Sequence, residues 1–277
     1  MKTLKIHPLK INFEIAVSPV LKLPRFVYLF VIEGTNIHFI DTGVASAIIQ
    51  IENFLKTINQ NITSVKNIFL THSHPDHIGT AKLIQQESHC SVYAPKDEIE
   101  WIINPELQFQ QRPVPGFNNL VSGPVTVNHI LNNGQIIQLE KNISVKIIST
   151  PGHSAGSTSF YFKEQNVLFC GDSILLPGEL PIFENIKDYL NSLDKIKVLN
   201  PHVLYSSWDE PRYENEITEI IDKSRAYILG IQKAAIKVSK NFEETNSIDF
   251  CKAVLSELGQ NESLANPLLI KSFRACL

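Results

Sequence analysis

The chain lacks several features that mark whole classes of proteins. Within its 277 residues no apolar run approaches the roughly 20 residues of a membrane-spanning helix, so we expect no membrane span. Its start lacks the continuous apolar core and the small-residue cleavage site of a secretory signal. The four cysteines are widely spaced and form no Cys-x-x-Cys pair, which suits reduced thiols. These absences predict a cytoplasmic protein.

An excess of positive charge is also lacking. The formal net charge is -3 and no basic stripe runs along the chain, which argues against a nucleic acid partner. A serine nucleophile elbow is missing too, because the run Gly156-Ser157-Thr158-Ser159 lacks the closing glycine. We therefore expect a small-molecule substrate, and a reaction that does not use a serine nucleophile. The composition does not indicate an oligomeric state.

Strand patterns dominate the first part of the chain. Phe26–Ile32 is a continuous apolar run, typical of a strand buried on both faces, and a turn at 33–36 joins it to a strand at 37–40. Further strands are predicted at Val65–Leu70, Ser91–Ala94, Val125–Ile130, Gln135–Leu139, Ile143–Thr150, Ser157–Phe162, Val167–Cys170 and Val203–Tyr205. Helical spacing predicts helices at Ala45–Gln60, Ile78–Glu87 and Ile186–Val198.

Two segments depart from this pattern. Residues 101–123 hold three prolines and little periodicity, so we predict an irregular excursion that acts as a lid or binding segment, with a disordered insertion as the alternative. From Tyr213 onward the apolar spacing is helical almost throughout. The predicted organisation is a strand-rich core over residues 1–211 and a helical C-terminal appendage over residues 212–277.

The densest chemistry lies in the run Thr71-His72-Ser73-His74-Pro75-Asp76-His77, directly after an apolar, β-branched stretch. Three imidazoles so close together are costly in an interior unless something binds them. Neutral imidazole and carboxylate are ligands that zinc and iron share, so the run indicates a metal site. The alternative is a polar loop that is rich in histidine by chance.

The spacing of this run predicts how its side chains divide. Side chains two apart on an extended segment point the same way, so His72 and His74 can reach one ion. Pro75 then ends the strand and places Asp76 and His77 at the start of a helix, where they can face a second ion. The helix dipole favours the carboxylate there and disfavours a protonated imidazole.

Two later clusters offer further ligands. Thr150-Pro151-Gly152-His153-Ser154 follows an alternating strand and presents one imidazole in a tight turn. Gly171-Asp172 follows another strand and presents a carboxylate that can bridge two cations. Taken alone, His153 and Asp172 could each be an ordinary turn residue. The strand ends at 37–43 and 167–173 also resemble each other, which hints at two related halves.

In this order, the three clusters resemble those of the metallo-β-lactamase superfamily, closest to the branch of hydroxyacylglutathione hydrolases, lactonases and persulfide dioxygenases. The resemblance covers about Phe26 to Trp208. It implies an α/β fold, the four-layer αβ/βα sandwich of two mixed sheets with helices outside, here with the helical C-terminal appendage. It also implies a ligand set. The first metal would be held by His72, His74 and His153, the second by Asp76 and His77, and Asp172 would bridge them.

One departure concerns the second metal. The family usually supplies a further histidine in a Gly-His turn after the last core strand, and this chain has Ser206-Ser207-Trp208-Asp209 there. His202 lies at the start of that strand and is a poor substitute. Asp209 is the nearest donor, with an ordinary loop aspartate as the open alternative. The resemblance thus implies two Zn²⁺ ions, the second one weakly held or absent.

The implied activity is hydrolysis of a small ester, thioester or lactone by a metal-bound hydroxide. Asp76 would orient this nucleophile or relay its proton. The main alternative keeps the fold but uses Fe²⁺ as a persulfide dioxygenase. Nucleic acid processing, known in the superfamily, is disfavoured by the charge. A non-catalytic binding module is a further alternative, because the final histidine is missing.

Overall fold

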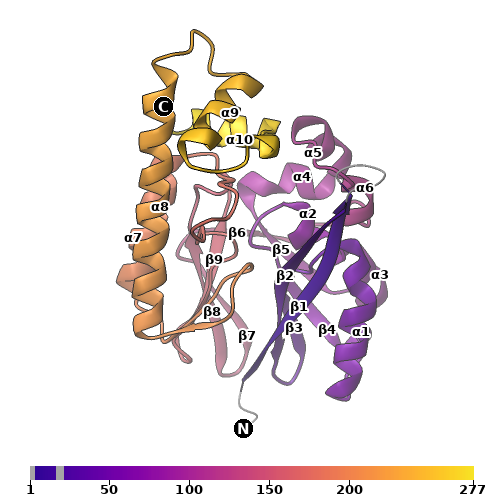
Figure 1. Ribbon diagram of the computed structural model, residues 1–277. Helices are drawn as coiled ribbons and strands as arrows, with labels where there is room; N and C mark the ends of the chain where they lie inside the picture. Colours follow the sequence, from indigo (N-terminus) through magenta and orange to yellow (C-terminus); the bar gives the residue numbers. More distant parts are fainter. Residues whose placement is uncertain (1–3, 17–21) are drawn as a thin grey trace. The chain divides into compact units, whose positions relative to one another are not determined.

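The computed structural model describes residues 4–16 and 22–277, and the chain divides into two compact units (Figure 1). The first unit comprises Met1–Ser149, Thr158–Gly171 and Tyr205–Pro211. The second unit comprises Thr150–Ser157, Asp172–Leu204 and Arg212–Leu277. Each unit therefore draws on several separate stretches of sequence. The predicted division between residues 211 and 212 follows a different boundary and stays a prediction.

The first unit contains a six-stranded mixed sheet in the order β1-β2-β3-β4-β5-β6. Strands β1 to β3 pair antiparallel, and β3 to β6 pair parallel. Its strands are β1 (Lys5–Ala16), β2 (Lys22–Glu33), β3 (Ile37–Ile40), β4 (Val65–Phe69), β5 (Ser91–Pro95) and β6 (His129–Leu131). Because β4 lies inside the sheet, its carboxyl end delivers the histidine run next to the ends of β3 and β5.

Helices of the first unit bury their apolar sides against this sheet. They are α1 (Ile48–Thr57), α2 (Pro75–Ile78), α3 (Ala81–Ser88), α4 (Ile99–Ile103), α5 (Pro105–Gln111) and α6 (Phe117–Leu120). Ile51 and Leu55 of α1 and Ile84 of α3 are fully buried in one apolar cluster with Val31 and Ile68 of the strands. This packing holds the carboxyl ends of the parallel strands, where the histidine run begins.

The second sheet has the order β12-β11-β10-β9-β8-β7. Its strands are β7 (Ile136–Glu140), β8 (Ile143–Ser149), β9 (Thr158–Phe162), β10 (Val167–Phe169), β11 (Val203–Tyr205) and β12 (Arg212–Tyr213). Strands β7 to β10 form an antiparallel meander. The two clusters predicted around His153 and Asp172 directly follow β8 and β10.

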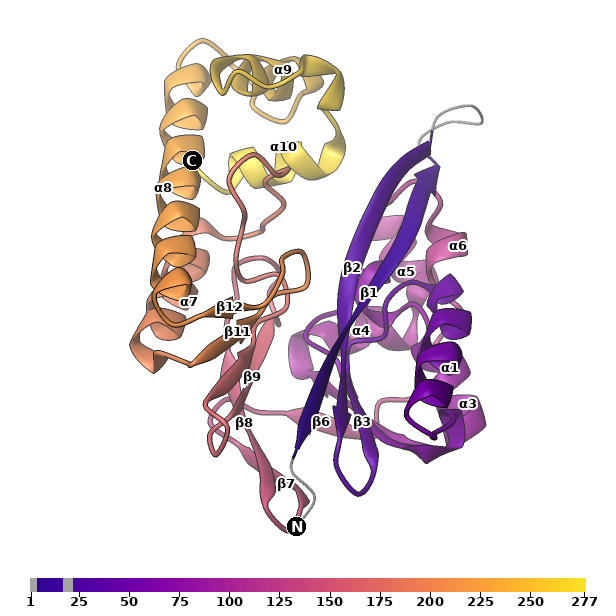
Figure 2. The ribbon, with the colours of Figure 1, turned by 60° about the horizontal axis from the view of Figure 1, so that its bottom comes forward.

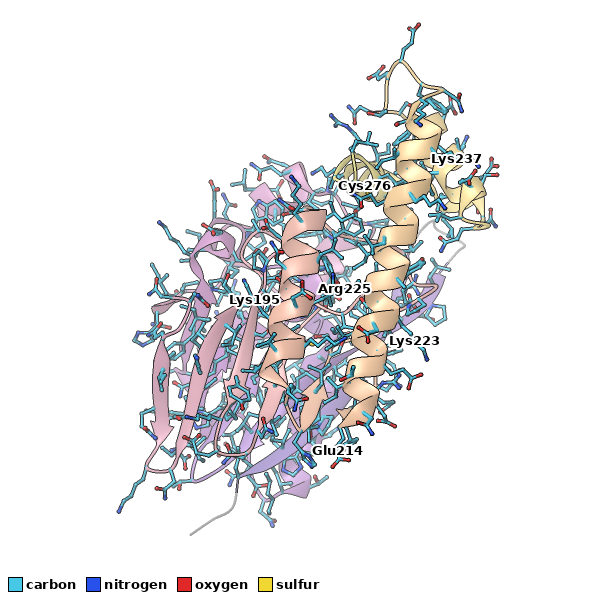
Figure 3. All side chains as sticks on the ribbon, turned by 90° about the vertical axis from the view of Figure 1, so that its left-hand side faces the viewer. Lys195, Glu214, Lys223, Arg225, Lys237 and Cys276 are labelled. Atoms are coloured by element: carbon cyan, nitrogen blue, oxygen red, sulfur yellow. The ribbon has the colours of Figure 1, made fainter. Side chains whose placement is uncertain are left out.

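Helices of the second unit include α7 (Ile186–Leu199), α8 (Asn215–Ser239), α9 (Ile248–Glu257) and α10 (Pro267–Arg274). Figure 3 shows α7 and α8 side by side, where Arg225 donates to the Leu190 carbonyl oxygen at 3.1 Å. Figure 2 shows α9 and α10 beside the C-terminal half of α8, where Lys237 pairs with Glu257 at 2.8 Å. The predicted helical tail is thus confirmed. Within the described ranges, no helix is long and apolar enough to cross a membrane.

The prediction of an irregular excursion over residues 101–123 is wrong, because most of this segment is helical. It contains the end of α4 together with α5 and α6. Pro105 occupies the first turn of α5, where its missing N–H costs nothing, and the Asn104 side chain accepts from the Leu107 amide at 3.2 Å. The proline that suggested irregularity therefore starts a helix.

Two other boundaries also differ from the prediction. The strand predicted over Val125–Ile130 is shorter, because the Gln85 side chain bonds both the amide and the carbonyl of Thr126 in place of a strand partner. The helix predicted over Ile78–Glu87 is interrupted at Gly79, where an added Cβ would lie 2.2 Å from the Leu120 carbonyl oxygen. Glycine at this position permits the close approach of α6.

Candidate metal centre

The histidine run lies in the first unit and extends from the end of β4 into α2. His72, His74 and His77 are 1%, 4% and 0% exposed. The Nε2 atom of His72 lies 3.0 Å from the Nδ1 atom of His74. The rings of His72 and His77 have centroids 4.0 Å apart. The three histidines of this run therefore form one buried group within the unit.

Asp41 at the end of β3 holds this group in place. Its carboxylate accepts from the Thr71 amide at 2.8 Å, from the Thr71 hydroxyl at 2.7 Å and from Nδ1 of His77 at 2.8 Å. It is fully buried, and its φ of 58° lies in the left-handed region that aspartate and asparagine tolerate best. The sequence showed Asp41 only as one of two similar strand ends, and its supporting role was missed.

These contacts also fix the proton positions on two imidazoles. The carboxylate of Asp41 can only accept, so His77 carries its proton on Nδ1. The Thr71 hydroxyl donates its single proton to the Asp41 carboxylate. It must therefore accept from Nδ1 of His72, which lies 2.9 Å away. In their neutral form, both rings then present an unprotonated Nε2, the form of imidazole that binds a metal.

Asp76 follows in the first turn of α2, as predicted. Its Oδ2 lies 3.6 Å from Nε2 of His77, and its side chain is 18% exposed. The two residues assigned to a second ion are thus neighbours within the first unit. Their binding of that ion stays a prediction.

In the second unit, His153 and Asp172 face each other. Nδ1 of His153 donates to the Ile182 carbonyl at 2.8 Å, so its Nε2 carries no proton in the neutral ring. That Nε2 lies 3.2 Å from Oδ2 of Asp172. Two such acceptors repel each other unless a cation, either a proton or a metal ion, lies between them.

The turn that carries His153 fits tightly against α7. Gly152 has a φ of 131°, and an added Cβ would lie 2.4 Å from the backbone N and Cα of Tyr189. The Tyr189 hydroxyl in turn donates to the Asp172 carbonyl at 2.7 Å, and the Ser192 hydroxyl donates to the Pro151 carbonyl at 2.7 Å. One helix therefore supports the turns that carry both ligands.

The segment that accepts from His153 is itself tied to the C-terminal helices. The Phe183 amide, next to Ile182, donates to the Ser272 hydroxyl of α10 at 2.9 Å. Ser272 and Phe183 are each 1% exposed. The helical tail thus supports the loop that orients a predicted metal ligand.

The donor chemistry of these residues fits a metal ion. His72 and His74 in the first unit, and His153 and Asp172 in the second, each offer one donor atom that could bind an ion, and the three histidines are buried. A tetrahedral zinc with Zn–N of about 2.0–2.1 Å places its ligand atoms roughly 3.3–3.4 Å apart. Within each unit the paired atoms are 3.0 Å and 3.2 Å apart, close to that spacing. Three imidazoles and a carboxylate suit zinc and also iron.

Asp209, predicted to stand in for the missing histidine, is not among those four residues. Its Oδ1 accepts from the Glu210 amide at 2.9 Å. The loop around it is fixed in the first unit, because Glu210 accepts from the Tyr28 hydroxyl at 2.5 Å and from Lys10 at 3.2 Å. A role for Asp209 at the second ion stays a prediction.

His202 points to a different partner. Its Nδ1 lies 3.6 Å from Glu214, and its side chain is 56% exposed. It therefore provides a histidine outside the buried group for comparison.

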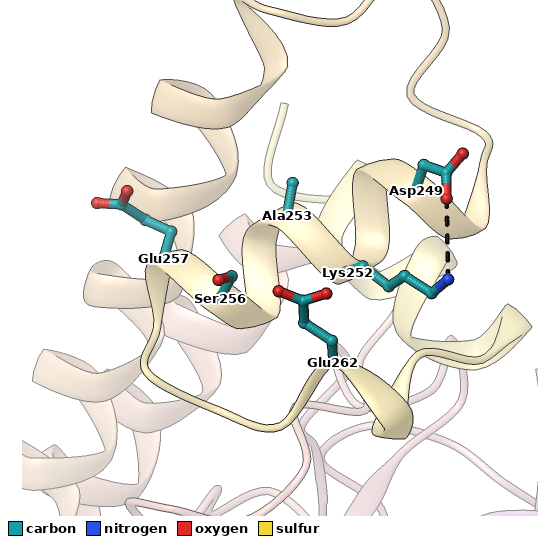
Figure 4. Close-up of a pocket in the computed structure, with 6 residues that line it drawn as sticks. All are labelled: Asp249, Lys252, Ala253, Ser256, Glu257 and Glu262. Carbon is teal, nitrogen blue, oxygen red and sulfur yellow. Dashed lines mark ion pairs between the residues drawn. The ribbon is translucent and has the colours of Figure 1, made fainter.

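A pocket of about 540 Å³ lies on α9 and the short helix after it (Figure 4). It is lined by Asp249, Lys252, Ala253, Ser256, Glu257 and Glu262. Asp249 and Lys252 form an ion pair across 3.9 Å. The lining contains none of the predicted metal ligands.

Comparison with known proteins identifies related chains. Residues 21–208 match the family model described as the metallo-beta-lactamase superfamily. The chain is 27% identical over 240 residues to a "Beta-lactamase-like protein 2 homolog" of Caenorhabditis elegans, covering 82% of this chain and 73% of that relative. It is 30% identical over 153 residues to a "Hydroxyacylglutathione hydrolase" of Legionella pneumophila (strain Paris), covering 55% of this chain and 48% of that enzyme.

A solved structure shares the fold over almost the whole chain. A metallo-beta-lactamase family protein from Thermus thermophilus is similar with a TM-score of 0.76 at 20% identity, covering 98% of this chain and 91% of that one. The predicted fold, two mixed sheets flanked by helices with further helices at the C-terminal end, is confirmed.

Proposed function

We propose that this chain, which belongs to the metallo-beta-lactamase superfamily, is a metal-dependent hydrolase that cleaves a small ester, thioester or lactone. The observation that carries the proposal is the set of donors His72, His74, His153 and Asp172. The first two lie in the first unit and the other two in the second. The similarity to a hydroxyacylglutathione hydrolase supports a thioester among the candidate substrates.

A bound zinc would supply a Lewis acid and a water activated for attack at neutral pH. The chain's own residues have the task of presenting the ligand atoms. Asp41 keeps the proton of His77 on Nδ1, and Thr71 does the same for His72. The carbonyl of Ile182 does this for His153. These three imidazoles are thereby held in the form that binds a metal before any metal arrives.

Asp76 is the group that we assign to proton transfer. Its side chain is 18% exposed, whereas that of the neighbouring His77 is 0% exposed. A partly exposed carboxylate can orient an attacking water and accept its proton, and then pass the proton to the solvent. Asp41 cannot share this role, because its carboxylate is fully buried and already accepts three hydrogen bonds.

The direct test is hydrolysis before and after metal removal. The protein is purified without added metal, its metal content is measured, and ester, thioester and lactone substrates are assayed. We expect chelation to abolish hydrolysis and Zn²⁺ to restore it. Undiminished hydrolysis after rigorous chelation would contradict the proposal, and so would stoichiometric iron with consumption of oxygen.

Histidine variants sharpen this test. We expect His74→Ala to abolish hydrolysis and zinc binding. His202→Ala is the matched control, because it removes an exposed imidazole outside the buried group and should change neither. Asp209→Ala should reduce hydrolysis less than His74→Ala does. Equal activity of His74→Ala and the unaltered protein would show that the assignment of the ligands is wrong.

A further inference from the structure

Ser73, the residue between His72 and His74, is hydrogen-bonded by two side chains from the segment after β5. The Glu98 carboxylate accepts from the Ser73 amide at 3.0 Å and, in a short hydrogen bond, from the Ser73 hydroxyl. The Gln108 side chain donates to the Ser73 carbonyl at 2.7 Å. Ser73, Glu98 and Gln108 are 0%, 3% and 0% exposed. Both backbone groups and the side chain of Ser73 are thus bonded away from water.

The histidine run requires such support because its backbone is irregular. After β4 ends at Phe69, residues 70–74 belong to no helix or strand, and the buried backbone groups of Ser73 bond to side chains in place of a strand ladder. Glu98 and Gln108 supply those partners from η3 (Lys96–Glu98) and α5. Two sites 25 and 35 residues away in sequence therefore fix the peptide groups between the two predicted ligands.

We propose that Glu98 is a positioning residue for the metal. By holding the amide and the hydroxyl of Ser73, it sets the direction in which the chain leaves His72 and enters His74. The 3.0 Å separation of Nε2 of His72 and Nδ1 of His74 depends on that direction. This inference rests on the proposed function only in that the ion is the same one. Groups that orient metal ligands typically change metal affinity by about 10–100-fold when removed.

The test measures zinc affinity in the absence of any substrate. The zinc dissociation constant is obtained by competition with a coloured chelator, and the visible spectrum of the Co²⁺-substituted protein reports the ligand geometry. We expect Glu98→Ala to weaken zinc binding about 10–100-fold and to alter the Co²⁺ spectrum. Glu98→Gln retains one oxygen that can accept both bonds from Ser73, so it should recover most of the affinity.

A second variant and a control separate positioning from a loss of stability. Ser73→Ala removes only the hydroxyl bond and leaves the Glu98 carboxylate in place, so it should disturb folding less. It should also weaken zinc binding less than Glu98→Ala. Ser224→Ala removes an equally buried serine, whose hydroxyl accepts from the Leu175 amide at 3.1 Å in the second unit. It should lower the free energy of unfolding without changing zinc affinity.

Two outcomes would overturn the inference. One is unchanged zinc affinity and an unchanged Co²⁺ spectrum in folded Glu98→Ala, or in Ser73→Ala if Glu98→Ala does not fold. The other is an equal loss of affinity in Ser224→Ala. If zinc affinity depends on Glu98 but the protein hydrolyses no substrate, the inference holds and the proposed hydrolase function fails.

Discussion

The two units support their metal-binding residues by different means. In the first unit, buried carboxylates do this work: Asp41 accepts from His77 and Thr71, and Glu98 accepts from Ser73. In the second unit, His153 donates to a main-chain carbonyl, and the main-chain carbonyl of Asp172 accepts from a tyrosine hydroxyl. These particular contacts therefore use charged side chains in the first half and neutral groups in the second.

This difference predicts different sensitivities. A hydrogen bond to a charged group contributes about 1.5–3 kcal/mol, against about 0.5–1.5 kcal/mol for a neutral one. Substitutions that remove charge should therefore damage the first half most. In the second half, the tight approach of Gly152 to α7 makes the backbone the vulnerable feature.

The largest effect on stability is expected for Gly152→Ala. The added Cβ would meet the Tyr189 backbone at 2.4 Å, at a φ of 131° that side chains rarely adopt. We expect the free energy of unfolding to fall by on the order of 3 kcal/mol, measured by urea denaturation. The matched control is Gly178→Ala, which has a φ of 92° but nothing within 4 Å of its Cβ. Equal losses in both variants would show that overlap with α7 is unimportant.

A smaller but specific effect is expected for Asp41→Asn. Asparagine tolerates the left-handed backbone of this position, so the change removes charge without adding strain. Only one of its two side-chain atoms can accept, so it cannot bond both the Thr71 amide and Nδ1 of His77 as Asp41 does. Zinc binding, measured by chelator competition, should weaken about 10–100-fold. Tyr189→Phe, which removes a neutral support in the second half, should weaken it less. The reverse order would contradict the comparison.

The smallest effect is expected for Glu140→Gln, which tests a charged support of the first unit outside the histidine run of residues 72–77. The Glu140 carboxylate accepts from the amides of Thr35 and Asn36 at 2.9 and 2.7 Å. Burial raises the pKa of Glu140, but these hydrogen bonds outweigh it and hold the pKa below its ordinary 4.5. The substitution should cost about 1–2 kcal/mol of unfolding free energy at neutral pH.

The pH dependence of that cost has a defined sign. A carboxyl whose pKa is lowered by folding stabilises the protein above its unfolded pKa, and this contribution disappears as pH falls through the folded pKa. Urea denaturation at several pH values should show the difference between Glu140→Gln and the unaltered protein shrinking below pH 4.5. A difference that does not change with pH would mean that the charge of Glu140 contributes nothing.

Much of the site could be predicted from sequence because its signals are local. The run from His72 to His77 follows a recognisable strand, and ligand chemistry depends on residue type. The supports could not be predicted, since Asp41 and His77 lie 36 residues apart and the Ile182 carbonyl is a backbone group without a sequence signature. Pro105 misled for a related reason, because proline both breaks and begins helices.

The central claim is that the predicted histidine ligands bind a metal ion, and the zinc content of two variants tests it most directly. His72→Ala removes a ligand from the first unit and His153→Ala removes one from the second. Zinc per folded chain is measured after dialysis against a weak chelator. We predict at least one zinc per chain in the unaltered protein and its loss in both variants. Retention of that zinc in either variant would contradict the claim.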